Sequence, residues 1–197
     1  MAAQPGVVFV FSGKRKCGKD YVAERLRERI GADCSAIYRL SAPLKEQYAR
    51  DHDLDFARLL DASAYKERYR GDMIRWGEEQ RERDPDFFCE LTAAGARDAG
   101  APVWIVSDAR RRTDVAFFRR RFARQTVLVR VVACEATRRA RGWTFTEGVD
   151  DAESECGLDE GVAWDHVVEN DGNETTLERH LDRLHSDAQS SLEGASL

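Results

Sequence analysis

The sequence predicts an α/β fold in which a parallel sheet of about five strands is covered by helices on both faces. Short apolar runs bounded by turn residues are typical of buried parallel strands, and residues 7–11 are the clearest example. Segments with apolar residues at helical spacing lie between these runs. Strands that alternate with helices are joined by crossover connections, which place helices on both faces of one sheet.

The N-terminal half contains two of the expected strands. Its predicted elements are, in order, a strand at 7–11, a helix ending at Gly31, a strand at 36–40, a helix from Pro43, a helix over 65–83 and a helix from Pro85. The first helix carries Val22, Leu26 and Ile30 on one face. Proline is favoured in the first turn of a helix, so Pro43 is interpreted as a helix start.

The C-terminal half continues the alternation. Its predicted elements are a strand at 103–106, a helix with Val115, Phe118 and Phe122 inward, a strand at 126–133, a helix over 135–141, a short strand at 167–168 and a closing amphipathic helix through Leu177, Leu181, Leu184 and Ala188. The strand at 126–133 is rich in β-branched residues, which favour strands. The tail after about residue 186 is rich in Ser, Gly and Ala, and we expect it to be loosely ordered.

Length and composition indicate one globular domain over residues 1–197. The net charge is −5 and no apolar run is long enough to span a membrane, so we expect a monomer that binds a small molecule rather than nucleic acid or a membrane. The five cysteines are scattered without a Cys-x-x-Cys pair, which favours reduced thiols in the cytosol over a zinc site. The terminal Ala-Ser-Leu is a poor match to a peroxisomal signal.

A phosphate-binding loop follows the first strand directly. Residues 13–19 read Gly-Lys-Arg-Lys-Cys-Gly-Lys and fit the pattern G-x-x-x-x-G-K between a buried strand and a helix. Backbone N–H groups converge on an anion in such a loop, and Lys19 would reach the β- and γ-phosphates of ATP. A basic turn that happens to contain two glycines is the alternative. The strand, loop and helix fall in the order that a P-loop requires, so the context favours a P-loop kinase fold over this alternative.

Two features of this loop are unusual. Asp20 stands where the motif normally has Ser or Thr, and it is either a magnesium ligand or an acid that interacts with the helix dipole. The cations at 14–16 exceed what the motif needs, so they either indicate highly charged substrates or point into solvent. The same cations and the helix N-terminus predict a lowered pKa for the Cys17 thiol.

Further charged residues are expected at the same edge of the sheet. Asp108 follows the strand at 103–106 and is predicted to hold magnesium or its waters. Arg110 and Arg111 come next and suit phosphate, although a solvated turn is the alternative. Residues 136–150, with Arg138 and Arg141, are predicted to form a mobile lid over ATP. The acidic stretch that starts at Asp150 either caps a helix or has a ligand role.

The chain resembles the animal-type phosphomevalonate kinases over nearly its whole length. The resemblance rests on the phosphate loop and on three other segments: PLKEQYA at 43–49, DMIRWGEE at 72–79 and VDDAESECGLD at 149–159. It implies a nucleoside-monophosphate-kinase-like fold. It also implies conversion of 5-phosphomevalonate and ATP to 5-diphosphomevalonate and ADP, with magnesium, on the route to isoprenoids and sterols.

The resemblance also implies roles for individual residues. It implies that Arg141 contacts ATP, that Asn170 binds the substrate, that Lys19, Arg110 and Arg111 are catalytic, and that ATP is bound by Lys14, Arg15, Lys16, Cys17, Gly18, Lys19 and Asp20. Arg138 and Asp171 are expected at the same ATP site from their places beside the lid and after the last strand. A substrate with a carboxylate at its far end needs a cation there, and Lys45 and Arg75 are the candidates. The acceptor-binding helices then span about 43–98. Asp171 appears where the family has another residue, as does His180. The acceptor is an ionised phosphate, so no strong general base is required.

Two other functions fit the same architecture. A nucleoside or deoxynucleoside monophosphate kinase would need a base-sized pocket, to which Trp76 and Tyr69 could contribute stacking surfaces. A nucleotide-gated binding protein would hydrolyse ATP slowly and have no small-molecule acceptor.

Overall fold

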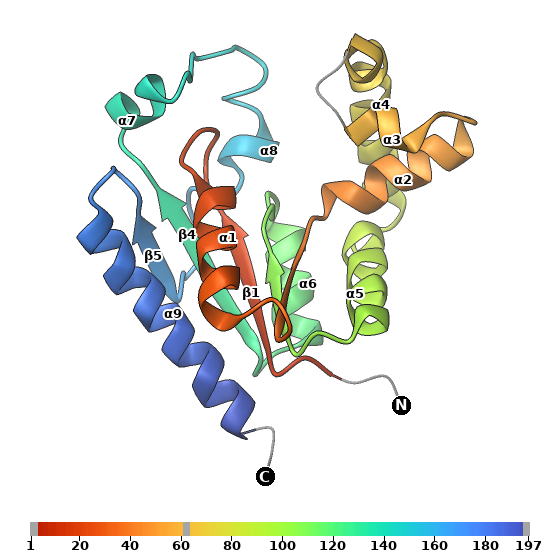
Figure 1. Ribbon diagram of the computed structural model, residues 1–197. Helices are drawn as coiled ribbons and strands as arrows, with labels where there is room; N and C mark the ends of the chain where they lie inside the picture. The colour runs from red at the N-terminus through yellow and green to blue at the C-terminus, as the bar shows by residue number, and fades with distance from the viewer. Residues whose placement is uncertain (1–3, 61–63, 195–197) are drawn as a thin grey trace.

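The computed structural model describes residues 4–60 and 64–194. Its centre is a five-stranded sheet in the order β2-β3-β1-β4-β5, and the strand pairs are all parallel (Figure 1). The strands are β1 (Val7–Ser12), β2 (Ser35–Tyr38), β3 (Val103–Val106), β4 (Thr126–Val132) and β5 (His166–Glu169). This sheet, with helices on both faces, confirms the predicted fold class.

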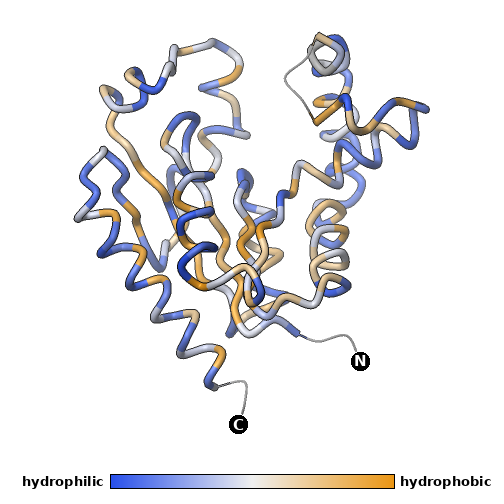
Figure 2. The backbone as a smooth tube through the Cα atoms, in the orientation of Figure 1, coloured by the Kyte–Doolittle hydropathy of each residue, from blue (hydrophilic) through white to orange (hydrophobic). Residues whose placement is uncertain are grey.

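β1 occupies the middle of the sheet and is buried along its whole length. Phe9 pairs with Ile105 of β3 on one side and with Val127 of β4 on the other. Figure 2 shows the apolar character of these central strands. Because the strands are parallel, their carboxyl ends lie at one edge of the sheet, and the segments that follow β1, β3, β4 and β5 meet there.

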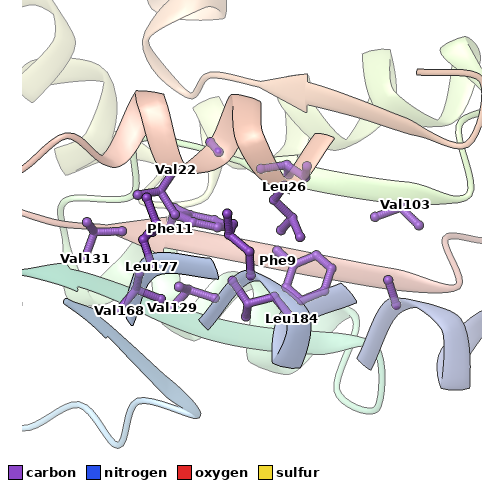
Figure 3. Close-up of a cluster of buried hydrophobic side chains, with 14 of the residues drawn as sticks. Phe9, Phe11, Val22, Leu26, Val103, Val129, Val131, Val168, Leu177 and Leu184 are labelled. Atoms are coloured by element: carbon purple, nitrogen blue, oxygen red, sulfur yellow. The ribbon is translucent and has the colours of Figure 1, made fainter. Parts of the chain in front are cut away.

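Alternate residues of β1 pack against different helices, as the period of two in a strand requires. On one face, Phe9 and Phe11 pack with α1 (Lys19–Ile30) and α9 (Glu174–Gly194), as Figure 3 shows. On the other face, Val8 and Val10 pack with α5 (Phe87–Ala99) and α6 (Arg112–Arg121). The expected inward residues of α1, α6 and α9 are buried or packed on these cores.

A third, smaller core lies away from the sheet. It is formed by α2 (Ser41–Asp51), α3 (Phe56–Leu60) and α4 (Ala64–Arg83), which stand together beside the carboxyl edge in Figure 1. Tyr48, Leu59 and Met73 are buried at its centre. Sequence analysis missed α3, because five residues are too few to show helical periodicity.

Two short helices complete the carboxyl edge. α7 (Glu135–Ala140) follows β4, and α8 (Glu153–Cys156) includes the second half of the acidic stretch that starts at Asp150. The expected loose tail after residue 186 is wrong: α9 continues to Gly194, because Ala188 is buried and Leu192 packs on the core shared with α1. No helix among the described residues is long and apolar enough to cross a bilayer.

Candidate active site

The phosphate loop connects β1 to α1 and has a backbone suited to enclosing an anion. Lys16 and Gly18 both have positive φ, at 63° and 85°, and the Cys17 N–H donates to the Lys14 carbonyl at 3.1 Å. A Cβ on Gly18 would lie 2.3 Å from Asn170 Nδ2, so only glycine fits there. The loop lines a cavity of about 310 Å³ whose residues are Gly13, Lys14, Arg15, Lys16, Gly18, Lys19, Asp20 and Arg110. We call this the donor cavity.

Asn170 and Arg141 fix the loop from the far side. The Cys17 carbonyl accepts hydrogen bonds from Asn170 Nδ2 at 2.9 Å and Arg141 Nη1 at 3.0 Å. Arg141 Nη2 also donates to the Asn170 carbonyl at 2.7 Å. Asn170 was expected to bind the acceptor, but it is buried beneath the loop because its amide satisfies this carbonyl. It therefore supports the loop that would hold ATP.

The extra cations of the loop have different environments. Lys14 Nζ lies 2.6 Å from Asp159, and Arg15 Nη1 lies 2.8 Å from Asp150. Lys16 is exposed to solvent. Lys19 Nζ is 3.2 Å from the Asp20 carboxylate at the start of α1. The acidic stretch after residue 150 thus pairs with the first two cations of the loop.

Arg15 joins the loop to the predicted lid segment at two points, Arg138 and Asp150, and to α8 at a third, Glu155. Its N–H donates to Glu155, its carbonyl accepts from Arg138 Nε at 2.8 Å, and its guanidinium binds Asp150. Burial alone would raise the pKa of Asp150, but hydrogen bonds from the Trp143 indole and the Thr146 N–H, with the nearby arginines, lower it. The mobility of residues 136–150 stays a prediction.

The thiol of Cys17 differs from expectation. The cations around it and the helix N-terminus predicted a lowered pKa, but burial raises the pKa of this thiol and outweighs Lys19, Arg130 and Arg138. Cys17 is 1% exposed, and its Sγ lies where a Cβ on Gly13 would come within 2.6 Å. Its side chain therefore packs in the core, and only its backbone N–H and carbonyl groups make the hydrogen bonds that shape the loop.

A second cavity, of about 260 Å³, lies between the sheet edge and the third core. It is lined by Leu40, Ser41, Leu44, Lys45, Arg70, Met73, Ile74, Glu78, Arg81, Asp108, Arg110, Arg111, Asp114 and Ser154. We call it the acceptor cavity. Lys45, Arg110 and Arg111, which the sequence predicts to bind the substrate, line this cavity, and Arg110 also lines the donor cavity. Its apolar wall is formed by α2 and α4.

Sequence analysis missed two arginines of this cavity, Arg70 and Arg81. Burial and the neighbouring charge of Arg111 lower the pKa of Arg81, so its environment favours an added anion. A signal was present in the sequence: Arg70, Ile74, Glu78 and Arg81 follow helical spacing and therefore share one face of α4.

Arg75 lies outside the acceptor cavity. It is one residue beyond Ile74, about 100° further around the helix, and it pairs with Asp72 in an exposed position. Arg75 instead lines a separate cavity with Tyr69 and Trp76. The predicted contact of Arg75 with the carboxylate end of the substrate is therefore not supported. Trp76 packs edge-on against Tyr48 with ring centroids 5.7 Å apart, which assigns this aromatic side chain to the third core.

The backbone of the arginine pair is held by a buried carboxylate that sequence analysis also missed. Asp114 is 2% exposed, and it accepts the N–H groups of Arg110 and Arg111 at 3.0 Å each. It lies three residues after Arg111 in the first turn of α6, a spacing typical of a helix capping box. Arg111 further pairs with Glu78 across the cavity.

The candidate metal ligands occupy different places. Asp108 accepts the N–H groups of Leu40 at 2.6 Å and Ser41 at 3.2 Å, and so satisfies the first free donors of α2. Asp20 is exposed and lines the donor cavity. Within the part of the chain that the structure describes, no three acidic, His or Cys side chains are grouped to hold a metal ion. Magnesium needs only one or two carboxylates when phosphates and water supply its other ligands, so Asp20 fits it.

Asp171 has a structural contact at the same edge. Its carboxylate accepts the Cys134 N–H at 2.7 Å, and this hydrogen bond is the main reason that the pKa of Asp171 is lowered. It links the ends of β4 and β5 near the predicted lid. Its predicted contact with ATP stays a prediction.

Comparison with known proteins identifies similar sequences and a similar fold. The family model described as phosphomevalonate kinase matches residues 11–124. The phosphomevalonate kinase of Drosophila melanogaster is 43% identical over 182 residues, which cover 90% of this chain and 96% of that protein. The crystal structure of TT1252 from Thermus thermophilus has a TM-score of 0.53 at 15% identity, covering 93% of this chain and 98% of that one. At that identity the likeness concerns the fold alone.

Proposed function

The chain belongs to the phosphomevalonate kinase family, and from this premise we propose how its two cavities divide the reaction. It phosphorylates phosphomevalonate in the mevalonate pathway, using ATP. The donor cavity takes the phosphates of ATP, and the acceptor cavity takes 5-phosphomevalonate. The products are 5-diphosphomevalonate and ADP.

In the donor cavity the backbone provides most of the binding. We expect the N-terminus of α1 and the other N–H groups of the phosphate loop to face the β- and γ-phosphates, since the Arg15 and Cys17 N–H groups already donate to Glu155 and to the Lys14 carbonyl. Lys19 neutralises charge on the transferred group, and its side chain is only 14% exposed, which strengthens its field. Arg138 and Arg141 lie on the lid side of the loop and, with Asp171, complete the ATP site.

One observation carries the proposal: Arg110 lines both cavities. Phosphoryl transfer requires the γ-phosphate and the acceptor phosphate to lie next to each other, and an arginine can donate to both at once. Arg111 then binds the acceptor phosphate from the other side. The acceptor oxygen is already ionised, so catalysis consists of positioning and charge neutralisation. Lys45, Arg70 and Arg81 are the cations of the same cavity for the carboxylate end.

Magnesium would be held mainly by the phosphates of ATP and by water, with Asp20 as the protein carboxylate at the donor cavity. When bound, it would neutralise negative charge on the β- and γ-phosphates. Asp108 lines the acceptor cavity, where its carboxylate orients α2. We further propose a cytosolic monomer that binds neither nucleic acid nor membranes, in keeping with its net charge of −5.

An acceptor screen tests this function. We expect purified protein with ATP and magnesium to phosphorylate 5-phosphomevalonate at least about a hundredfold better than AMP, CMP, UMP, dTMP or mevalonate, because each lacks several of the polar contacts. Preference for a nucleoside monophosphate in the side-by-side assay would overturn the proposal. Trp76 and Tyr69, the surfaces suggested for a base, line a different cavity, so the structure gives that alternative no support.

A further inference from the structure

Glu155 is a buried carboxylate that connects the phosphate loop to the arginine shared by the two cavities. It lies in α8, and its side chain is only 2% exposed. One carboxylate oxygen accepts the backbone N–H of Arg15. The other accepts Arg110 Nη1 at 2.9 Å. A single side chain thus holds the loop with one oxygen and the guanidinium with the other.

The rest of Arg110 is already fixed at its backbone. Its N–H donates to Asp114 at 3.0 Å, so α6 holds the main chain in place. The side chain reaches away from that anchor, is 37% exposed, and meets protein acceptors at α8: Glu155 and the Ser154 carbonyl at 3.2 Å. A long, flexible arginine in such an open place has many rotamers available to it. Glu155 is the charged partner that restricts it.

We propose that Glu155 is a positioning residue for phosphoryl transfer. It holds the Arg110 guanidinium between the γ-phosphate of ATP and the acceptor phosphate. Because Glu155 also binds the Arg15 N–H, it fixes the position of this guanidinium relative to the phosphate loop. The inference rests on the proposed role of Arg110. When Arg110 is held between the phosphates, its guanidinium neutralises their charge most strongly in the transition state, where they are closest to each other. Without Glu155, the Arg110 side chain could move to bind either substrate in the ground state. Binding of the ground state does not accelerate the chemical step.

The test uses a double-mutant cycle in the full chain. Glu155→Gln keeps the shape of the side chain but presents an amide donor or a neutral oxygen to Arg110. We expect kcat to fall about 10- to 100-fold, as misplacement of a catalytic group by about 1 Å does, while both KM values change less than about threefold. In an Arg110→Met background, Glu155→Gln should change kcat by less than about threefold, because the group it positions is gone.

Glu153→Gln is the matched control. Glu153 is exposed in the same short helix, so the same chemical change there should leave kcat and both KM values unaltered. Thermal unfolding and ATP binding are measured for every variant. If Glu155→Gln does not fold, Glu155→Asp replaces it, since a shorter carboxylate keeps the charge but does not reach both partners. Normal kcat in a folded Glu155→Asp protein would then overturn the inference.

The outcomes separate the inference from the proposed function. Normal turnover in Arg110→Met overturns the role of Arg110 and the inference with it. An impaired Arg110→Met together with a normal Glu155→Gln overturns the inference alone. Fully additive losses in the double variant also overturn it, because Glu155 would then act without Arg110.

Discussion

The two cavities are built in different ways. The donor cavity is formed largely by consecutive residues, 13–20, whose backbone is shaped by Gly18 and fixed by Asn170. The acceptor cavity is formed by side chains from α2, α4, the segment after β3, α6 and α8, which lie far apart in the sequence. The first therefore depends on local backbone geometry, and the second depends on how separate helices pack.

This difference has a consequence for specificity. Every nucleotide offers the same phosphates to the backbone N–H groups of a loop, so under the proposed function the donor cavity recognises a common chemical group. The acceptor cavity has its own small core of Tyr48, Leu59 and Met73, which sets the positions of its arginines. Under the proposed function, we expect changes in that core to affect the binding of 5-phosphomevalonate more than the binding of ATP.

The largest effect is expected at the donor cavity. Lys19→Met should lower kcat by about two to three decades, since loss of one preorganised contact to transition-state charge costs on the order of 3–4 kcal/mol. The melting temperature should stay close to that of the parent, because Lys19 packs in none of the hydrophobic cores. Steady-state kinetics and thermal unfolding provide the measurements. Near-normal turnover in a folded variant would contradict the assignment of the loop.

The next effect distinguishes the acceptor cavity from its neighbour. Arg81→Met should raise the KM for 5-phosphomevalonate about 10- to 150-fold, the loss expected for a charge-assisted hydrogen bond of about 1.5–3 kcal/mol, and should leave the KM for ATP nearly unchanged. Arg75→Met is the matched control, because Arg75 is exposed and paired with Asp72 on another face of the same helix. Equal effects of the two variants would show that the acceptor binds elsewhere.

A smaller effect separates the two candidate magnesium ligands. Asp20→Asn should raise the magnesium concentration needed for half-maximal rate about fivefold, which corresponds to ~1 kcal/mol for one exposed charge. Asp108→Ala should instead lower the free energy of unfolding by about 1–2 kcal/mol, because the N–H groups of Leu40 and Ser41 lose their acceptor. Magnesium titrations and denaturant unfolding of both variants check this. The reverse pattern would restore Asp108 as the metal ligand.

The smallest effect concerns the thiols. Burial raises the pKa of Cys17, so this thiol stays protonated at neutral pH and becomes a nucleophile only as the pH rises. We expect alkylation of Cys17 near pH 7.5 to be at least about tenfold slower than that of the exposed Cys34 and Cys134. Mass spectrometry of peptides after timed labelling measures the rates. If Cys17 were instead alkylated fastest, its pKa would be lowered, as the surrounding cations predict.

Much of the fold was predictable because its signals are local. The strand at 103–106 agrees with the structure at both ends, and the helix over 65–83 agrees to within one residue. Composition misled at the C-terminus, where small polar residues suggested a loose tail. The packing of Ala188 and Leu192 against the core holds this segment as a helix, and local composition gives no signal of such a tertiary contact.

The candidate site was predictable to the extent that it is local. The motif at 13–19 reveals the phosphate loop, but it does not reveal that Lys14 and Arg15 pair with Asp159 and Asp150. Arginine suits a phosphate site and a surface ion pair equally well, so residue type alone did not separate Arg75 from Arg81. The rotation of α4 against α2 separates them, and that rotation is set by packing of the third core.

The hydrogen bond from Asn170 to the Cys17 carbonyl joins residues 153 positions apart, so during translation it can form only after most of the chain has been made. β1 lies at the centre of the sheet, but its neighbours β3 and β4 come from the second half of the sequence. The segment that contains Asn170 follows β5, which is later still. The phosphate loop is therefore synthesised early, but its contact with Asn170 forms only when most of the remaining chain is present.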